Sequence, residues 1–268
     1  MIIDSSIDPN MSSGMDPKFS LDSLQGLSAN SSYYASGMDN TNLRGQAVRE
    51  TALSLGMQAG LYYESTQINK VLDKNTSQLD KVFDFGILLF EDNVLPPVIV
   101  DASNMVHIND QGDTMRIAGK TYRIVSQVRF VTAPPTWRDY LWMSYPPPEM
   151  PNRHTLPKSS TERQAWQLGV AEGWNLGISQ AVTIYHINLH RLVQDFDGMI
   201  LYEDLLLKNM VSPFYVQKKY YGITGSGSHM AIDDENWSIT VKPELQLHSK
   251  LWNPIVQSGD ENGANRNS

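Results

Sequence analysis

Apolar residues first recur at helical spacing from residue 43 onward. They follow one another at intervals of three and four positions, which places them on one face of a helix: Val48, Ala52, Leu55, Ala59 and Tyr62. Gly56 and Gly60 lie one turn apart in the same segment. Because charged residues surround them, a membrane helix pair is excluded. We therefore expect these glycines to allow the close packing of two helices in water.

Two further helical segments follow. One is expected to begin at residues 75–76 and to end before a Pro-Pro pair, with its apolar positions inward: Leu79, Val82, Phe83, Leu89 and Phe90. The stronger segment covers residues 160–210, where Ser159 and Glu162 have the spacing of a capping box. Gly198 predicts a kink or an end within this helix.

Between the helical segments the apolar period changes to two, which predicts β-strands. The drier face of one strand holds alternate residues: Tyr122, Ile124, Ser126, Val128 and Phe130. Residues 115–117 can pair with this strand across a turn at Gly119 and Lys120. Residues 98–100 are expected to form a neighbouring strand.

The C-terminal part predicts a β-hairpin or a small sheet, because residues 214–223 and 237–241 alternate again. The glycine-rich run TGSGSH at residues 224–229 lacks the Gly-Lys-Ser/Thr of a phosphate loop, and we expect a loop there. The acidic residues 233–235 lack the ligand pattern of a calcium loop and are expected to form a solvated turn.

Helices and strands are grouped in blocks rather than alternating strictly, which favours an α+β fold. We expect long amphipathic helices packed with a small, mainly antiparallel sheet. Residues 1–42 are rich in Ser, Asn, Asp and Gly without an apolar period, so they predict a disordered N-terminal arm. Residues 253–268 predict a flexible tail. Residues 43–252 are expected to form a single domain, because neither a long polar linker nor a repeat interrupts them.

The net charge of −8 is concentrated at the ends of the chain. Residues 1–42 carry −4 and residues 258–268 carry −1, so −3 is left for residues 43–257. A nearly neutral body argues against direct nucleic-acid binding, which needs a concentrated positive field. The sequence has no cysteine, and this removes disulfides, thiolate nucleophiles and cysteine zinc sites from consideration.

The densest aromatic stretch is FVTAPPTWRDYLWMSY at residues 130–145, which lies between two groups of prolines. Thr136 can cap a short helix within it. This much aromatic area must be buried either in the core of the protein or in a partner. Interface anchors are enriched in Trp and Tyr, so the candidate partner-contact residues are Trp137, Tyr140, Trp142 and Tyr145.

His186 and His190 lie four residues apart, which is a spacing used by zinc sites, but Ile187 stands where a zinc protease has a Glu. We expect structural histidines, with no metal and no cofactor. Residues 173–190 hold no Asp, Glu, Lys or Arg, yet their polar residues predict a buried central helix rather than a membrane span. No arrangement of serine, histidine and acid stands out, and we expect a protein that is not an enzyme.

Six stretches in order along residues 45–247 carry a common family pattern. They are ETALSLGMQAG (50–60), DFGILLFEDNVLPPVIV (84–100), FVTAPPTWRDYLWMSY (130–145), GWNLGISQA (173–181), DFDGMILYEDLLLKNMVSPFYV (195–216) and GITGSGS (222–228). Together they resemble the DotC family, the lipoprotein of type IVB secretion systems, whose relatives on conjugative plasmids are called TraI-like.

This resemblance implies a non-enzymatic structural subunit of the outer-membrane core complex, located at the periplasmic face. The implied partners are DotD-like and DotH-like proteins, with many copies arranged in a homo-oligomeric ring. Members of the family normally carry a signal peptide and a lipidated cysteine at the mature N-terminus. This sequence has neither, and we expect an omitted or misplaced start to explain the difference.

Two other functions stay open at this point. One is an envelope metal-dependent hydrolase that uses His186 and His190. The other is a binding module for a peptide or glycan, with the aromatic stretch as its groove. Zinc analysis would separate the hydrolase from the structural subunit, and co-purification with secretion partners would separate the binding module from it.

Overall fold

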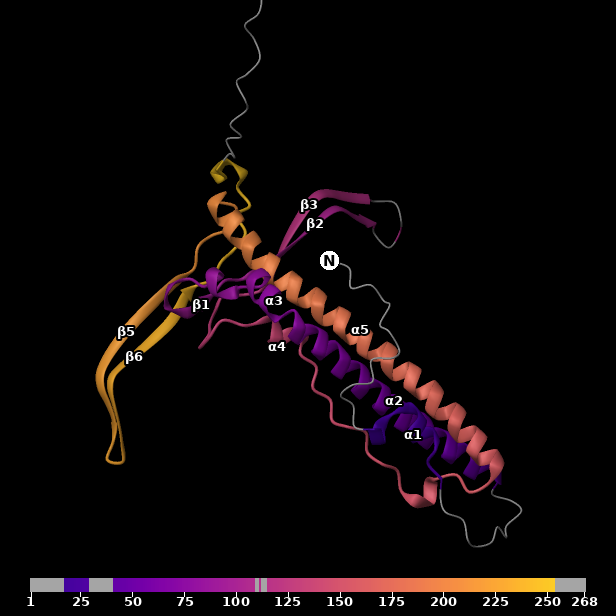
Figure 1. The fold of residues 1–268 in the computed structure, drawn as a ribbon. Coiled ribbons are helices and arrows are strands. Elements are labelled where there is room, and N and C mark those ends of the chain that lie inside the picture. The colour runs from indigo at the N-terminus through magenta and orange to yellow at the C-terminus, as the bar shows by residue number, and fades with distance from the viewer. Residues whose placement is uncertain (1–16, 29–40, 109–110, 112–114, 254–268) are drawn as a thin grey trace, which may run out of the picture. The chain divides into compact units, whose positions relative to one another are not determined.

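A computed structural model describes residues 17–28, 41–108, 111 and 115–253 (Figure 1). The contacts between residues divide the chain into two compact units. Unit 1 takes its residues from Met1–Asp80 and Trp137–His190, and unit 2 takes its residues from Lys81–Thr136 and Arg191–Ser268. The single domain expected over residues 43–252 stays a prediction.

Unit 1 is built on two helices that lie side by side, α2 (Thr41–Lys74) and the first part of α5 (Ser160–Leu207) (Figure 1). Gly173 lies against Leu53, and Gly177 lies against Met57. Because both positions advance by four residues, the two helices run in the same direction. The helix expected from residue 43 onward is therefore confirmed and has a parallel neighbour.

Five glycines form the contact between these helices, and we call them the glycine seam: Gly56, Gly60, Gly169, Gly173 and Gly177. A Cβ atom added to Gly173 would stand 2.1 Å from the Leu53 carbonyl oxygen. One added to Gly60 would stand 2.3 Å from the Trp174 carbonyl oxygen. No side chain fits in such spaces, so only glycine permits this approach of two backbones. The close packing predicted from Gly56 and Gly60 is confirmed.

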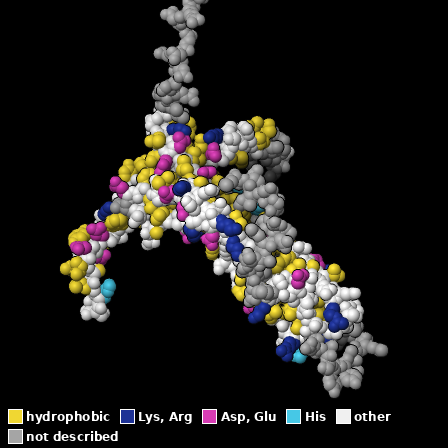
Figure 2. Space-filling model, in the orientation of Figure 1, with side chains coloured by type: hydrophobic (Ala, Val, Ile, Leu, Met, Phe, Trp, Pro, Cys, Tyr) yellow, Lys and Arg dark blue, Asp and Glu magenta, His cyan; other side chains and the backbone are white. Residues whose placement is uncertain are grey.

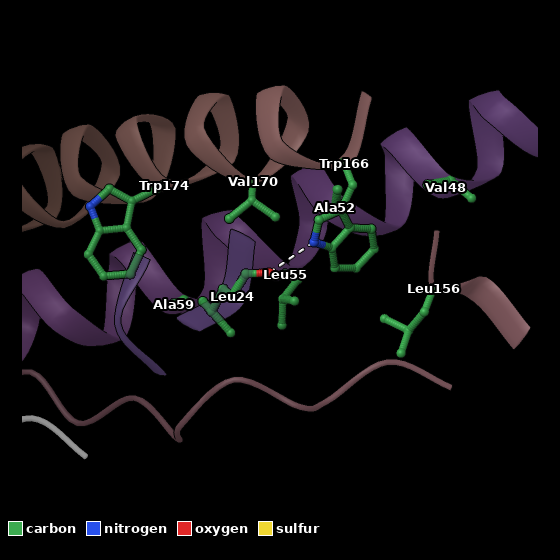
Figure 3. Close-up of a cluster of buried hydrophobic side chains, with 9 residues drawn as sticks. All are labelled: Leu24, Val48, Ala52, Leu55, Ala59, Leu156, Trp166, Val170 and Trp174. Atoms are coloured by element: carbon green, nitrogen blue, oxygen red, sulfur yellow. Dashed lines mark hydrogen bonds between the residues drawn. The ribbon is translucent and has the colours of Figure 1, made fainter. Parts of the chain in front are cut away.

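The core of unit 1 lies at this contact (Figure 3). Its buried side chains come from α2, from α5, from the short helix α1 (Leu21–Gln25) and from Leu156 in the segment that leads into α5. They are Leu24, Val48, Ala52, Leu55, Ala59, Leu156, Trp166, Val170 and Trp174. The indole Nε1 of Trp166 donates a hydrogen bond to the Leu24 carbonyl oxygen at 2.9 Å (Figure 3). Four of the five apolar positions predicted for the first helix are thus buried, and Tyr62 is half-buried.

Part of the arm expected to be disordered is ordered, and the prediction is wrong for residues 17–28. These residues form a 3₁₀ turn (Pro17–Phe19) and α1, whose cap is the Ser20 hydroxyl accepting a hydrogen bond from the Ser23 amide. The side chain of Leu24 is fully buried against α2 and α5. One inward leucine and one cap are too little periodicity to predict a helix. Residues 41 and 42, the end of the predicted arm, begin α2. The rest of the arm, residues 1–16 and 29–40, and the tail from residue 254 lie outside the described residues.

A segment without strands, residues 142–159, follows the short helix α4 (Trp137–Leu141). It contains one 3₁₀ turn (Arg153–Thr155), and we call it the strap. The side-chain amide of Asn69 holds the backbone of Met143 from both sides, donating to its carbonyl at 2.6 Å and accepting from its amide at 3.2 Å. The Arg44 guanidinium donates to the carbonyl oxygens of His154 and Leu156. Side chains of α2 thus satisfy backbone groups of the strap, which has no sheet neighbour to do so.

Helix α5 has a well-defined signal at each end. At its start the Glu162 amide donates to the Ser159 hydroxyl at 3.1 Å, and the Ser159 amide donates to the Glu162 carboxylate at 3.4 Å, which confirms the capping box. At its end Asn209 adopts a positive φ of 54°, and the Met210 amide donates to the Leu205 carbonyl at 2.8 Å. This is the hydrogen bonding of a Schellman motif, with Asn where Gly is commoner.

Gly198 does not end α5, which continues unbroken to Leu207, so the expected helix end is wrong. Its role is a close contact within unit 2. A Cβ atom on Gly198 would stand 2.5 Å from the Val98 Cγ1 atom and 2.8 Å from the Ile99 carbonyl oxygen. The glycine therefore lets strand β2 (Val98–Ile108) lie directly on the helix.

The second helix expected from the sequence is much shorter than predicted. It is α3 (Thr76–Val82), and a 3₁₀ turn (Phe85–Leu88) follows it. The Asp84 carboxylate accepts a hydrogen bond from the Gly86 amide at 2.9 Å and so caps this turn. A short polar side chain that bonds to the backbone two residues on competes with the helix, and the apolar period alone does not reveal this.

The described residues of unit 2 form three antiparallel pairs of strands. The shortest joins β1 (Val94–Leu95) to β4 (Arg129–Phe130). The two long hairpins pair β2 with β3 (Met115–Ser126) and β5 (Tyr215–Ser226) with β6 (His229–Val241). Each pair is a separate two-stranded sheet. The α+β class is confirmed, with three small antiparallel sheets in place of one.

The two long hairpins test the predicted turns differently. The turn expected at Gly119 and Lys120 is wrong, because β3 passes straight through both residues and pairs with β2 over its whole length. Gly119 lies inside β3 and meets nothing within 4 Å, so neither a turn nor a close contact explains the glycine at this position. The C-terminal hairpin is confirmed, with its turn at Gly227 and Ser228. Most of the expected loop 224–229 and all of the acidic residues 233–235 belong to its strands.

Candidate interaction surfaces

The aromatic stretch divides into a buried part and an exposed part. The ring of Trp137 is only 1% exposed, and its Nε1 donates a hydrogen bond to the Asp80 carboxylate at 2.6 Å. The Arg138 guanidinium lies over this ring at 4.3 Å and also pairs with Asp80 at 3.6 Å. Because Trp137 is enclosed by its own unit, the prediction that it contacts a partner is wrong, and it is a core residue.

The other three candidate contact residues are accessible to different degrees. Trp142 is 44% exposed, while Tyr140 and Tyr145 are half-buried. Trp142 follows α4 directly and Tyr145 lies in the strap. The stretch therefore offers one exposed indole flanked by two partly covered phenols. This is a smaller surface than the sequence predicted.

Hairpin β2–β3 exposes large apolar side chains that the sequence analysis did not single out. Val106 pairs directly with Ile117, so both side chains lie on one face of the ribbon. Met115 lies on the same face, since it is two residues from Ile117 on β3. All three are at least half exposed, and Ile117 reaches 63%. We call these three residues the first apolar tip.

Hairpin β5–β6 repeats this arrangement. Met230 and Ile232 are two residues apart on β6, and Met230 pairs with Gly225, which is two residues from Ile223 on β5. These side chains share one face, and Ile223 is 69% exposed. We call Ile223, Met230 and Ile232 the second apolar tip. Figure 2 shows hydrophobic side chains along this ribbon with acidic side chains beside them.

Apolar exposure on this scale is unusual for a strand surface that stays in water. An isolated two-stranded hairpin is marginally stable, and a third strand or a covering layer normally protects its apolar face. Within the described residues, neither long hairpin has a third strand. The alternation over residues 214–223 did predict strands. It could not predict that their apolar face is open, because period two indicates a drier face without indicating what covers it.

Two titratable groups have pKa values that are raised mainly by burial. Burial raises the pKa of Glu64, whose side chain is almost fully enclosed on α2. Burial also raises the pKa of Tyr202 to about 12, against a smaller opposing effect of the Phe214 amide. Tyr202 belongs to the unit 2 core with Ile99, Leu205 and Val211. These shifts reflect packing, and neither group stands beside a base or nucleophile in a cleft.

His186 and His190 are both exposed on α5. Among the described residues, no group of three or more His, Cys, Asp or Glu side chains is placed to hold a metal ion. A catalytic zinc site needs three protein ligands, so these two histidines do not form one with their described neighbours. In the described part of the chain, no helix is both long and apolar enough to cross a membrane.

Comparison with known proteins gives one family. The family model for the type IV secretory system and conjugal DNA–protein transfer, the TraI family of these systems, matches residues 42–254. The chain belongs to this family. The match includes all six stretches on which the resemblance was based, and it runs through both units and both long hairpins. No curated protein matches the chain at a significant level.

Proposed function

We propose that this member of the type IV secretory TraI family is a structural, non-enzymatic subunit of the outer-membrane core complex of a type IVB secretion or conjugation system. In this proposal it works at the periplasmic face, beside DotD-like and DotH-like proteins and further copies of itself in a ring. One observation carries the proposal. The family match spans two hairpins whose apolar tips are left open, which is what a subunit with docking partners requires.

The physical logic is that of a scaffold with protruding contacts. Unit 1 has a filled core of its own, so it can keep its shape without help. The hairpins expose β-branched and methionine side chains, and methionine adapts readily to irregular partner surfaces. Trp142 adds an exposed indole of the kind that anchors interfaces. These surfaces favour binding, and none of them assembles a nucleophile with a base.

Co-purification tests the proposal. The full chain would be co-expressed with the DotD-like and DotH-like proteins of the same system, and we expect a stable complex. The double variant Ile223→Ser and Met230→Ser should weaken that complex at least tenfold while the purified chain stays folded. A matched control is Leu168→Ser and Leu207→Ser, which changes two exposed apolar residues of α5 outside the hairpins. A folded chain that never associates with secretion proteins would overturn the proposal.

Zinc analysis tests the competing hydrolase. We expect purified protein to hold substoichiometric zinc that does not change with His186→Ala or His190→Ala. Stoichiometric zinc lost in both variants, together with turnover of a substrate, would replace the structural function by an enzymatic one.

A further inference from the structure

Both strands of each long hairpin have a free edge, and among these four strands β3 and β6 carry the largest charges, which are opposite in sign. Strand β3 holds Arg116, Lys120 and Arg123 and no carboxylate. Strand β6 holds Asp233, Asp234 and Glu235 and no Lys or Arg. Because each hairpin has only two strands, β3 and β6 each present one edge of backbone N–H and C=O groups without a neighbouring strand among the described residues.

Such an edge can pair with another strand, and charge decides which strand is acceptable. Like charges opposite each other destabilise a strand pair, whereas opposite charges stabilise it. A pairing of β3 with a second β3 therefore brings three positive side chains against three positive ones, and β6 with β6 has the same conflict of negative charge. Pairing β3 with β6 removes the conflict at both edges.

We propose that β3 of one copy of this chain pairs edge to edge with β6 of a second copy. Two marginal two-stranded ribbons would then become one four-stranded antiparallel or mixed sheet, which is wide enough to be stable. The strands match in length, with 12 residues in β3 and 13 in β6. Within one chain these two strands belong to separate sheets, so neither edge is paired with the other there, and their opposite charges favour a second copy as the acceptor.

The cations of β3 are available for this contact to different degrees. Lys120 already pairs with Asp101 at 3.1 Å and lies 5.3 Å from the centre of the Tyr122 ring. Arg116 and Arg123 are exposed and have no ion-pair partner in the described part of the chain. They are therefore the positive side chains best placed to meet a second copy.

The carboxylates of β6 are positioned by their own hairpin. Asp234 accepts a hydrogen bond from the Thr224 hydroxyl at 2.6 Å, and Glu235 accepts one from the indole Nε1 of Trp237 at 2.7 Å. Asp233 accepts one from the Tyr220 hydroxyl and has a positive φ of 57°, which a lysine would adopt with strain. Asp234 and Glu235 are therefore the better positions for charge reversal.

The contact is head to tail, because each copy contributes a different strand to it. Such an interface closes into a ring or continues as a filament. The inference rests on the proposed function in one respect only, namely that the chain works in several copies. Charged edges also serve to keep isolated strands apart, and the experiment must separate that role from pairing.

A charge-exchange experiment makes this separation. Three forms of the full chain would be compared by analytical ultracentrifugation: Arg116→Glu with Arg123→Glu, Asp234→Lys with Glu235→Lys, and all four changes together. We expect each double variant to weaken self-association at least tenfold. The fourfold variant restores opposite charges, so its association should return to within about threefold of the original chain. Added salt should weaken the original contact.

The control reverses two exposed arginines of unit 1, Arg153→Glu and Arg163→Glu. It changes the net charge as the β3 variant does, and it should associate like the original chain. Circular dichroism would verify that every variant is folded. Failure of the fourfold variant to recover, or association of either double variant at the original strength, overturns the β3–β6 contact. So does an original chain that stays monomeric.

Co-purification with DotD-like and DotH-like proteins separates this inference from the proposed function. If the original chain binds those partners without self-association, the strand contact is wrong and the proposed function stands. If it self-associates with the expected charge dependence and never binds them, the strand contact stands and the proposed function is wrong.

Discussion

In unit 1 the backbones of α2 and α5 approach so closely that five glycines line the contact, whereas in unit 2 no third strand among the described residues lies beside either long hairpin. The large apolar side chains of unit 1 are mostly enclosed, and those at the hairpin ends of unit 2 are mostly open. Both regions fall inside one family match. In the proposed function, unit 1 would supply the stability of a scaffold and the hairpins would supply surface for other chains.

The largest expected effect comes from filling the glycine seam. Gly173→Leu should unfold unit 1, at a cost of about 5 kcal/mol or more, because its side chain would occupy the space of the Leu53 carbonyl. Gly173→Ala should still cost about 3 kcal/mol. Chemical denaturation followed by circular dichroism measures both changes.

Two matched substitutions keep this test specific to the seam. Gly45 on α2 and Gly119 on β3 meet nothing within 4 Å. Gly45→Ala should stabilise the protein by up to about 1 kcal/mol, because alanine is the better helix former. Gly119→Ala should be nearly neutral. Equal costs at Gly45, Gly119 and Gly173 would contradict the account of the seam.

The second test compares two tryptophans five residues apart. Trp137→Ala should cost about 3 kcal/mol, since it empties a buried site and leaves Asp80 without its indole donor. Trp142→Ala should cost less than about 1 kcal/mol and should weaken assembly instead. Unfolding curves and co-purification measure the two effects. A monomer that unfolds when Trp142 is removed would place that residue in the core as well.

The sequence predicted what depends on local pattern. The helical spacing around Val48, the capping box at Ser159 and the C-terminal hairpin all depend on residues close together along the chain, and each is present in the structure. The glycine pair at 56 and 60 was also informative, because a missing side chain has a direct meaning for close packing.

What the sequence missed depends on contacts between distant segments. Leu24 is ordered because Trp166, 142 residues later, donates to its carbonyl. Trp137 is buried and donates a hydrogen bond to Asp80, which lies 57 residues earlier in the chain. The exposure of Ile117 was missed for the opposite reason. The strand pattern indicates an apolar face, and we expected other residues to cover that face. Burial of a residue is settled by its tertiary neighbours, and no spacing rule includes them.

The third test uses pH and concerns the start of α5. Burial alone would raise the pKa of Glu162, but hydrogen bonds from the Lys158 and Ser159 amides and the charge of Arg44 outweigh it, so the net pKa is lowered. A lowered pKa in the folded state means that the ionised carboxylate stabilises the fold above its unfolded pKa of about 4.3. That contribution is lost as the pH falls through the folded pKa.

Glu162→Gln provides the comparison. At neutral pH the variant should be less stable than the original chain by about 1 kcal/mol, and the difference should shrink as the pH falls below about 4. Denaturant unfolding at a series of pH values measures it. A difference that stays constant with pH would mean that the charge of Glu162 contributes nothing to the cap.

The smallest effect on stability is expected where the most apolar surface is open. Ile117→Thr in the first apolar tip and Ile232→Thr in the second should each change the free energy of unfolding by less than about 0.5 kcal/mol, because both side chains are 63% exposed in the folded chain. Threonine keeps the β-branched shape that strands favour, so each hairpin should be retained. The same variants should bind less of a dye that fluoresces on apolar surfaces. A loss of stability comparable to that of Trp137→Ala would mean that the tips pack within the chain, and the contrast between the two units would then fail.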